Sequence, residues 1–391
     1  MAAVIILLMI RILGGALKVF GFLLLTILLW PYFLSRHYDY RPHGPFRGES
    51  WYNPYAGAGD RWQKANFHAH SRAWLGLTNG HFTADSVYSK YVALGYDVPT
   101  VSNYQKLSAL PNTNQPNYVP VYEHGYNTTK THQLVIGARR VSFYDLVPYQ
   151  SLDNKQYVIE LLGKTAELIC INHPSIRNGY REAELKKLTG YQLVEVLNRG
   201  RSFEGRWDVA LSAGHPVWAL GNDDSHDIAR PWETGSSWTM INSPTNRADD
   251  IYAALRAGRS YIVRGEGAIN KYYLTRSEVR GDSLHLSFSG KPKEIRLIGQ
   301  DGRQLRSWKD TSDAVYELQE SDSYVRAAAY YGDFDILLNP VLRYDGKGTP
   351  QNTLTAEGNA LKTFAARTLV VLTWLALFWL FYVRRWWKAR R

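Results

Sequence analysis

Two histidines separated by one residue, His68 and His70, begin a set of side chains that could do metal chemistry. In Phe67-His68-Ala69-His70 both imidazoles fall on one side of an extended segment, because alternate residues of a strand point the same way. His173 follows the apolar run of residues 168–171, so it is expected to emerge where a buried strand ends. Each group alone has an ordinary explanation, since histidine pairs are often surface residues and a single histidine often packs in a core.

Residues 221–227, Gly-Asn-Asp-Asp-Ser-His-Asp, crowd carboxylates and an imidazole behind another apolar segment. Such crowding is unfavourable unless a cation compensates it. Asp224 and His226 repeat the one-residue spacing of the first pair, so both side chains are expected to face one centre. Glu123 and His132 flank strand-like segments and would supply a bridging carboxylate and another imidazole. Taken together, these groups at expected strand ends predict a metal site.

The cysteine count restricts the kind of metal site. Cys170 is the single cysteine, so the chain has no intramolecular disulfide and no thiolate cage. The ligands must therefore be nitrogen and oxygen atoms, which suit divalent zinc, manganese or iron.

The elements that would position these residues follow two patterns. Between about residues 63 and 265, short apolar stretches alternate with helix-like stretches. This rhythm favours a parallel sheet or barrel with functional side chains at the carboxyl ends of strands. The candidate strands lie before His68 and over residues 96–102, 133–137, 167–172, 193–197 and 218–222, and candidate helices over 83–94 and 180–188. From about 268 to 345 alternating strands with Gly and Asp-Gly turns predict a small β-sandwich.

Both ends of the chain are apolar. Residues 19–34 carry no charge and the preceding stretch only Arg11 and Lys18, which makes the segment long enough to cross a hydrocarbon core of about 30 Å. A cleaved signal peptide is the alternative, but no small-x-small cleavage site follows. Residues 368–383 are also apolar and end in the basic, Trp-containing tail 384–391. We expect two spans, both termini cytoplasmic, and the region between them periplasmic or extracellular.

The expected organisation is therefore an N-terminal anchor (1–35), a linker (36–59), a metallohydrolase barrel (60–265), a β-sandwich (266–345), a linker (346–362) and a C-terminal helix with its basic tail (363–391). The net charge of +11 lies largely beside the apolar segments, so membrane orientation explains it and a nucleic-acid partner is not expected.

The ordered motifs HAH, GYDVPTVSNYQ, YEHG, HQLVIG, INHP and GNDDSHD, over about residues 62–265, resemble the PHP family, named for its polymerase and histidinol phosphatase members. The later segments AALRAGRSYIVRG, SYVRAAAYY and LLNPVLRYD resemble its carbaryl-hydrolase-like branch. The resemblance implies an α/β fold, a distorted (β/α)7 TIM-like barrel, with metals at the strand carboxyl ends. One metal would be held by His68, His70, Glu123 and Asp224, and a second by Glu123, His132 and His173. His226 would belong to a third site or donate a proton.

The sequence departs from the family at Ser102-Asn103-Tyr104, where the family usually has Thr-Asp-His. Two ligands of a third metal are therefore missing, and we expect a two-metal centre. His81 would partly substitute for them or be a surface histidine at a helix start.

A metal-bridging hydroxide would serve as nucleophile, with Asp224 and His226 as catalytic residues and phosphoester hydrolysis as the leading reaction. Arg177 and Arg230 are the candidate substrate-binding residues. The alternatives are carboxyl or carbamate ester hydrolysis on the same centre, a non-catalytic sensor or scaffold, and a nuclease. The anchors indicate the membrane as a partner and a small-molecule, lipid or envelope-linked ester as substrate; the sequence does not set the oligomeric state.

Overall fold

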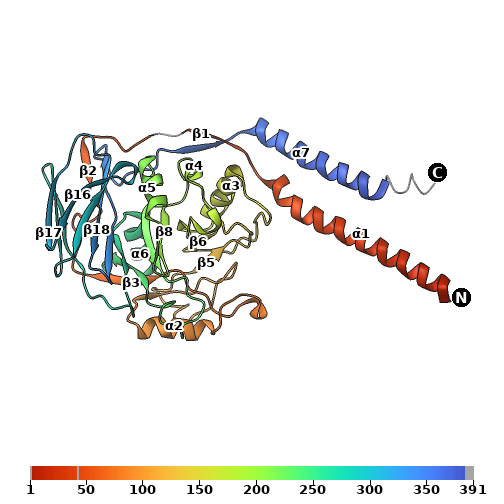
Figure 1. The fold of residues 1–391 in the computed structure, drawn as a ribbon, viewed down its shortest axis with the longest axis horizontal. Coiled ribbons are helices and arrows are strands. Elements are labelled where there is room, and N and C mark those ends of the chain that lie inside the picture. Colours follow the sequence, from red (N-terminus) through yellow and green to blue (C-terminus); the bar gives the residue numbers. More distant parts are fainter. Residues whose placement is uncertain (1, 42–43, 384–391) are drawn as a thin grey trace.

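The structure of the chain is a computed structural model that describes residues 2–41 and 44–383. A globular part of mixed helices and strands lies at one end, and two long helices leave it together (Figure 1). The predicted basic tail, residues 384–391, lies outside the described residues.

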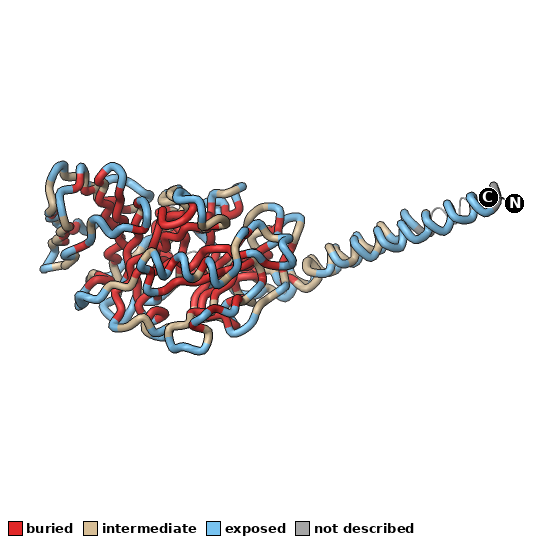
Figure 2. Tube along the Cα trace, turned by 90° about the horizontal axis from the view of Figure 1, so that it is seen from below, coloured by how far each residue is buried: buried red, intermediate tan, exposed pale blue. Residues whose placement is uncertain are grey.

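The two helices are α1 (Ala2–Leu34) and α7 (Ala360–Phe378), which a π-helical turn, η4 (Trp379–Val383), extends. Leu8–Leu34 and Ala360–Phe381 are each long and apolar enough to cross a membrane, and neither is buried against the globular part (Figure 2). The helices contact one another, for example where Trp374 Nε1 donates to Thr26 Oγ1 at 2.9 Å. At the globular end, β1 (Tyr38–Arg41) pairs with β21 (Thr355–Gly358), which joins the two connections. The predicted pair of apolar terminal helices is present; their orientation in a membrane stays a prediction.

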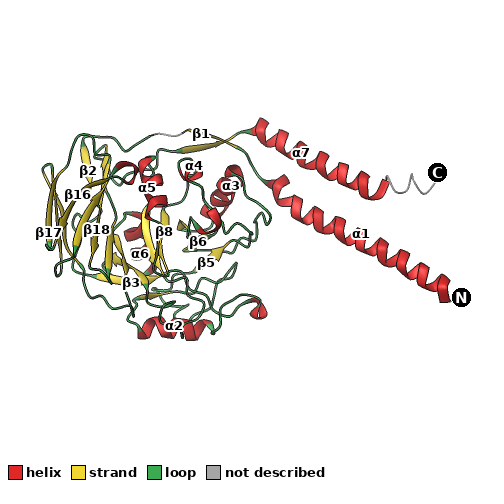
Figure 3. Cartoon of the chain, in the orientation of Figure 1, coloured by secondary structure: helices red, strands yellow, loops and turns green. Residues whose placement is uncertain are grey.

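One sheet of the globular part has the order β10-β8-β7-β6-β5. Its strands are β5 (Val121–His124), β6 (Gln133–Ile136), β7 (Leu168–Ile171), β8 (Leu193–Asn198) and β10 (Trp218–Asn222), with β9 (Arg201–Ser202) paired to β8. The five strands of the path are buried along their whole length, as their apolar runs predict. Three helices belong to this part: α3 (Leu152–Gly163), α4 (Glu182–Leu185) and α5 (Glu204–Ser212) (Figure 3).

A second sheet contains β3 (Trp62–Asn66), β4 (Val98–Pro99), β11 (Ser237–Asn242) and β12 (Ser260–Arg264), with α2 (Ala84–Ala93) and α6 (Ala248–Arg256) nearby in sequence. It continues from β12 through β19 (Asp335–Leu338) and β18 (Tyr324–Tyr330) to β15 (Glu294–Ile298) and β16 (Gln304–Lys309). Off this path, β20 (Val341–Tyr344) joins β18 to β2 (Ser50–Tyr52). A separate sheet of β13 (Leu274–Arg280), β14 (Ser283–Phe288) and β17 (Asp313–Glu317) shares an apolar core with β15 and β18.

The predicted closed (β/α)7 barrel is not found among the described residues, whose strands fall into separate sheets. β7, β8 and β10 are parallel as predicted, but β5, β6 and β7 are antiparallel. The physical reason is visible at β5 and β6, because only residues 125–132 connect them and they contain no crossover helix, which parallel neighbours require. Two isolated bridges, Ala69 to Ser225 and Tyr104 to Glu123, join the two large sheets where the candidate ligands lie.

Candidate metal centre

The seven predicted ligands lie in strands of the two large sheets or directly beside them. His68 and His70 follow β3, and the backbone N–H of His70 donates to the carbonyl of Ser225 at 2.7 Å. Glu123 lies in β5 and His132 directly precedes β6, while His173 follows β7 and Asp224 and His226 follow β10. The structure brings all seven into overlapping groups of possible metal ligands.

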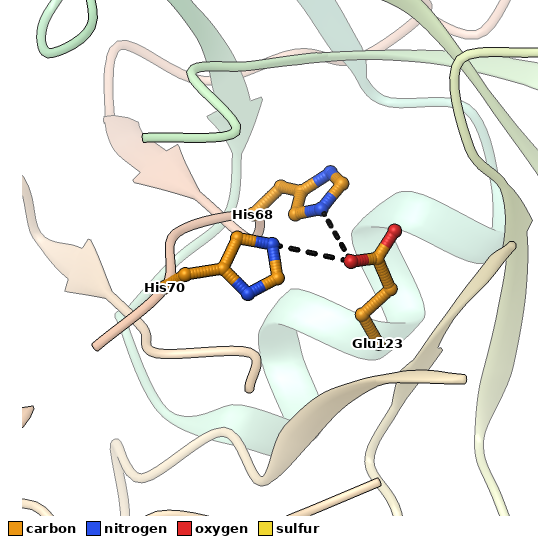
Figure 4. A group of neighbouring side chains, drawn as sticks. All are labelled: His68, His70 and Glu123. Carbon is orange, nitrogen blue, oxygen red and sulfur yellow. Dashed lines mark ion pairs between the residues drawn. The ribbon is translucent and has the colours of Figure 1, made fainter. Parts of the chain in front are cut away.

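The first group consists of four side-chain atoms that converge on one point. His68 Nε2 lies 3.3 Å from Glu123 Oε2 and 3.2 Å from Asp224 Oδ1. His70 Nε2 lies 3.1 Å from the same Glu123 oxygen (Figure 4) and 3.3 Å from the same Asp224 oxygen. A tetrahedral ion with ligand bonds of about 2.0–2.1 Å holds its ligand atoms about 3.3–3.4 Å apart. The four distances between histidine and carboxylate atoms are therefore close to those around a tetrahedral ion, while Glu123 and Asp224 fall in different groups of possible ligands.

Three of these four atoms have no hydrogen-bond partner. His68 Nε2, His70 Nε2 and Glu123 Oε2 are buried and make no hydrogen bond. Unpaired buried polar atoms are costly, and several of them close together indicate a site for a cation. The donor set of imidazole and carboxylate thus fits a divalent ion.

Glu195, in β8, fixes the state of His68. Its Oε1 lies 2.8 Å from His68 Nδ1, so a proton is held on Nδ1 and Nε2 is the nitrogen that would bind a metal. A carboxylate behind a ligating histidine is the usual arrangement at metal sites.

The second group is built around the other oxygen of Glu123. Glu123 Oε1 lies 2.8 Å from His132 Nδ1 and 3.3 Å from His173 Nε2, and Asn172 Nδ2 donates to it at 3.1 Å. Gly125 gives the His132 ring its place, because a Cβ on this residue, at φ +125°, would lie 2.5 Å from the ring. Glu123 can therefore bridge two ions, one at each oxygen.

His226 lies at the edge of the first group. Its ring stacks on His70 with centroids 4.3 Å apart, and its Nδ1 lies 3.8 Å from Asp224 Oδ1. Arg199 Nη2 lies 2.9 Å from this Nδ1 and also donates to the Asp224 carbonyl. Donation from Arg199 makes Nδ1 an acceptor and puts the ring proton on Nε2, whereas the Asp224 carbonyl, also 2.9 Å from Nδ1, accepts from the other tautomer. Nε2 is buried without a hydrogen bond.

The electrostatics of the centre favour positive charge. Burial opposes ionisation of Glu123, but His68 and His132 outweigh it and hold the pKa of this carboxyl well below its usual range. Burial likewise opposes ionisation of Asp224, yet His68 and His70 keep its pKa well below the usual range. For His226, burial and the neighbouring His70 lower the pKa to about 3, so the ring is neutral at physiological pH.

The three carboxylates of residues 223–227 have different partners. Asp223 is buried and accepts hydrogen bonds from the backbone N–H groups of residues 235–237 and from Tyr91. Asp227 pairs with Arg230 at 3.1 Å and with His81 at 3.2 Å. Asp224 alone of the three belongs to the groups of possible ligands.

The two arginines predicted to bind substrate contact other partners. Arg177 is exposed and donates to the carbonyl of Thr128 at 3.0 Å. Arg230 forms ion pairs with Asp227 and Glu233, both at 3.1 Å. His81 is half exposed and lies in none of the groups of possible ligands among the described residues. Arg199, which sequence reasoning missed, is the arginine that reaches the centre.

Tyr104 takes part of the space where the family pattern has a histidine. Its ring stacks on His70 with centroids 4.6 Å apart and meets His132 edge-on at 5.5 Å. An aromatic ring between the two groups of ligands orders both imidazoles. The SNY motif gave a sequence signal for this position, whereas Glu195 lay within an apolar run and gave none.

A pocket of about 550 Å³ opens onto Tyr104 and His132. Its other lining is mixed, with aromatic or apolar side chains and the polar Thr78, Asn79, Gln105 and Asn127. Its single cation is Lys130, whose Nζ lies 5.8 Å from the centre of the Tyr104 ring. The pocket therefore gives a substrate access to the second group of ligands.

No family model matches the chain, and no curated protein matches it. The chain is similar to a solved structure from Bacteroides vulgatus, of a two-domain protein containing a predicted PHP-like metal-dependent phosphoesterase. The match covers 82% of this chain and 99% of the Bacteroides chain. The sequence identity is 12% and the TM-score 0.40, which does not assign this chain to a family.

Proposed function

We propose that the chain is a membrane-anchored, metal-dependent phosphoesterase of the PHP type. The observation that carries the proposal is the approach of His68 and His70 to the carboxylates of Glu123 and Asp224 at 3.1–3.3 Å, with the facing atoms of His68, His70 and Glu123 buried and without a hydrogen bond. These residues belong to the ordered motifs that resemble the PHP family, which supports the assignment to that family. The carbaryl-hydrolase-like branch stays a prediction from the later motifs.

Two ions fit the residues present. His68, His70, Glu123 and Asp224 would hold one, and Glu123, His132 and His173 the other. Such ions, when bound, lower the pKa of water to near neutrality and offset the charge that develops on an attacked phosphorus centre. The nitrogen and oxygen ligands suit zinc, manganese or iron.

The protein's own residues would orient the substrate and stabilise the leaving oxygen. In hydrolysis the water oxygen forms a bond to phosphorus while the bond from phosphorus to the leaving oxygen breaks, and the leaving oxygen takes up a proton from water. Neutral His226, in the tautomer with its proton on Nε2, would donate a hydrogen bond to that leaving oxygen, and donation from Arg199 to Nδ1 favours this tautomer. Arg199 also adds positive charge beside Asp224, 4.0 Å from its Oδ2.

Carboxyl or carbamate ester hydrolysis is the second candidate. Its support is the lining of the pocket, in which Lys130 is the single cation, while Arg177 and Arg230 contact other groups. A neutral ester needs less positive charge around it than a phosphate dianion does.

The test is an activity screen of the full chain in detergent, loaded with zinc, manganese or iron. Release of p-nitrophenol from p-nitrophenyl phosphate or bis-p-nitrophenyl phosphate, with little turnover of p-nitrophenyl acetate, is the expected result. Asp224→Asn should abolish turnover. Asp227→Asn is the matched control three residues away, because Asp227 pairs with Arg230 rather than with the ligand group. This variant should keep its turnover. Turnover of the acetate alone would select the ester reaction, and a chain that binds no metal would overturn both.

A further inference from the structure

A loop beside the pocket exposes large apolar side chains. It contains η1 (Trp74–Gly76), in which Leu75 is 102% exposed, and the following Leu77, which is 89% exposed. Across the pocket mouth, Phe143 is 61% exposed and meets the Trp74 ring edge-on at 6.2 Å. Isolated exposed apolar residues are common, but a contiguous set at the mouth of a pocket marks a contact surface.

The loop is held in a strained and defined conformation. Trp74 and Leu75 have positive φ, at 51° and 56°, which is costly for bulky residues. The loop is nevertheless fixed, because Trp74 Nε1 donates to the carbonyl of Tyr104 at 2.7 Å and Thr78 Oγ1 bonds the backbone of Ala73. Strain that presents leucines to the surroundings indicates that these side chains have a partner outside the chain.

The position of the mouth identifies that partner. Tyr144, next to Phe143, donates from its hydroxyl to the carbonyl of Pro31 in α1 at 2.7 Å. Tyr149, at the end of the same segment, exchanges hydrogen bonds with the Tyr32 hydroxyl at 2.6 and 3.2 Å. The segment that forms one side of the pocket mouth is thus bound to the globular end of the apolar helix. In Figure 1 the orange loop of η1 lies at the same end of the globular part from which α1 leaves.

We propose that the pocket mouth, defined by Trp74, Leu75, Leu77, Tyr126 and Phe143, inserts into the bilayer that α1 and α7 cross, and that the substrate is a glycerophospholipid. The reaction in this inference rests on the proposed function, and the presence of a bilayer rests on the two apolar helices. The acyl chains stay in the membrane while the phosphate head group enters the pocket past Lys130 toward His132. The amphiphile matches the lining, which is apolar at the mouth and polar at its inner end.

Insertion is tested without any assay of activity. The single native thiol, Cys170, is fully buried, so a cysteine introduced at Leu75 can be labelled selectively with a nitrobenzoxadiazole probe. The full chain is reconstituted into phosphatidylcholine and phosphatidylglycerol vesicles, with and without acyl chains carrying a doxyl quencher. Leu75→Cys should be quenched strongly. Val315→Cys is the control, because Val315 is an exposed apolar residue on β17, at the opposite end of the globular part from α1 (Figure 1). Equal or absent quenching at both positions would overturn the inference.

Substrate class is tested with Leu75→Ser, a variant that changes a fully exposed side chain beside the pocket and none of the residues that line it. It should lower turnover of phosphatidate or phosphatidylglycerol in vesicles about tenfold or more, and leave turnover of p-nitrophenyl phosphate within about twofold. Equal loss on both kinds of substrate, or no loss on lipid, would contradict a lipid substrate. A wild-type chain active on the soluble phosphate but inactive on lipid would overturn the inference and leave the proposed function standing. A wild-type chain inactive on both would overturn the proposed function, whereas the quenching result would still decide insertion.

Discussion

Glu195→Gln is the most informative single change, because the carboxylate of Glu195 is surrounded by donors. Its Oε1 lies 2.8 Å from His68 Nδ1 and 3.1 Å from Asn222 Nδ2. Its Oε2 accepts from the backbone N–H of His173 and from Asn198 Nδ2, both at 2.9 Å. A glutamine has one amide oxygen, so its NH₂ group must face two donors in either orientation.

The two orientations have different consequences. If the NH₂ group faces His68, Nδ1 must accept and the ring proton moves to Nε2, where Glu123 and Asp224 offer acceptors at 3.3 and 3.2 Å. A metal then has to displace that proton before it can bind. If the NH₂ group faces His173 and Asn198 instead, the protein loses two buried hydrogen bonds, each at a cost of about 1–3 kcal/mol. The first orientation is therefore favoured, and metal affinity falls.

Removal of a partner behind a ligand weakens metal binding about 10- to 100-fold, or about 1.4–2.7 kcal/mol. The assay is competition for zinc with a chelating dye, at a fixed pH, on the full chain in detergent. We expect one of the two ions to bind that much more weakly in Glu195→Gln, while the other keeps its affinity.

Glu184→Gln is the matched control. Glu184 is a buried carboxylate held by Lys155 at 2.6 Å and by Arg181 at 2.7 Å, and it lies outside every group of possible ligands among the described residues. It should lower the melting temperature without changing zinc affinity. Should Glu195→Gln behave in the same way, Glu195 would be only a structural residue and the assignment of the Nε2 lone pair of His68 would be wrong.

Three further outcomes are expected. Arg199→Ala should reduce kcat about 100-fold and leave both ions bound, because it removes the donor to His226 Nδ1; metal loss instead would make Arg199 a structural support. Divalent metal at 100 times its Kd should stabilise the wild-type chain by about 2.7 kcal/mol, which is measured as a rise in Tm. Asp224→Asn should reduce this rise, and an equal rise in the wild-type chain and the variant would contradict the ligand assignment. His215 is buried with an unpaired Nδ1, and burial lowers its pKa from 6.5 to about 3. The unfolded chain therefore takes up a proton first, and the free energy of unfolding should fall by about 1.4 kcal/mol per unit as pH drops below 6.5 toward 3; urea unfolding of His215→Gln should lack this part of the slope.

The sequence predicted which candidate side chains come together better than it predicted the sheets that carry them. His173 and Asp224 follow apolar runs, and a polar residue at the end of a buried strand is visible without any knowledge of how the strands pair. Pairing depends on contacts between distant segments, so the antiparallel β5 and β6 were read as part of a parallel barrel.

Residues that act through another side chain were also missed. Glu195 lies in β8, in which every residue is buried. Its position in this apolar strand was read only as part of the core. Arg199 approaches the centre because the chain turns after β8, where Arg199 itself has a φ of 48°. A glycine would have indicated a turn with positive φ, but this position holds an arginine. The predicted Arg177 and Arg230 were chosen by their closeness in sequence to ligands, whereas their local partners hold them elsewhere.

The backbone at the ligands links metal binding to folding. His173 and Asp224 adopt positive φ, at 25° and 48°, and non-glycine residues hold such values only where surrounding interactions fix them. His68 and His70 extend from the sheet that contains β3, while Glu123 and Asp224 belong to β5 and the end of β10 in the other sheet. An ion bound by these four residues would therefore join the two sheets at the edge where the isolated bridges of Ala69 and Tyr104 lie. Since an unfolded chain does not hold these groups together, the free energy of metal binding adds to the stability of the fold, and the strain at the ligands is offset when the ions are bound.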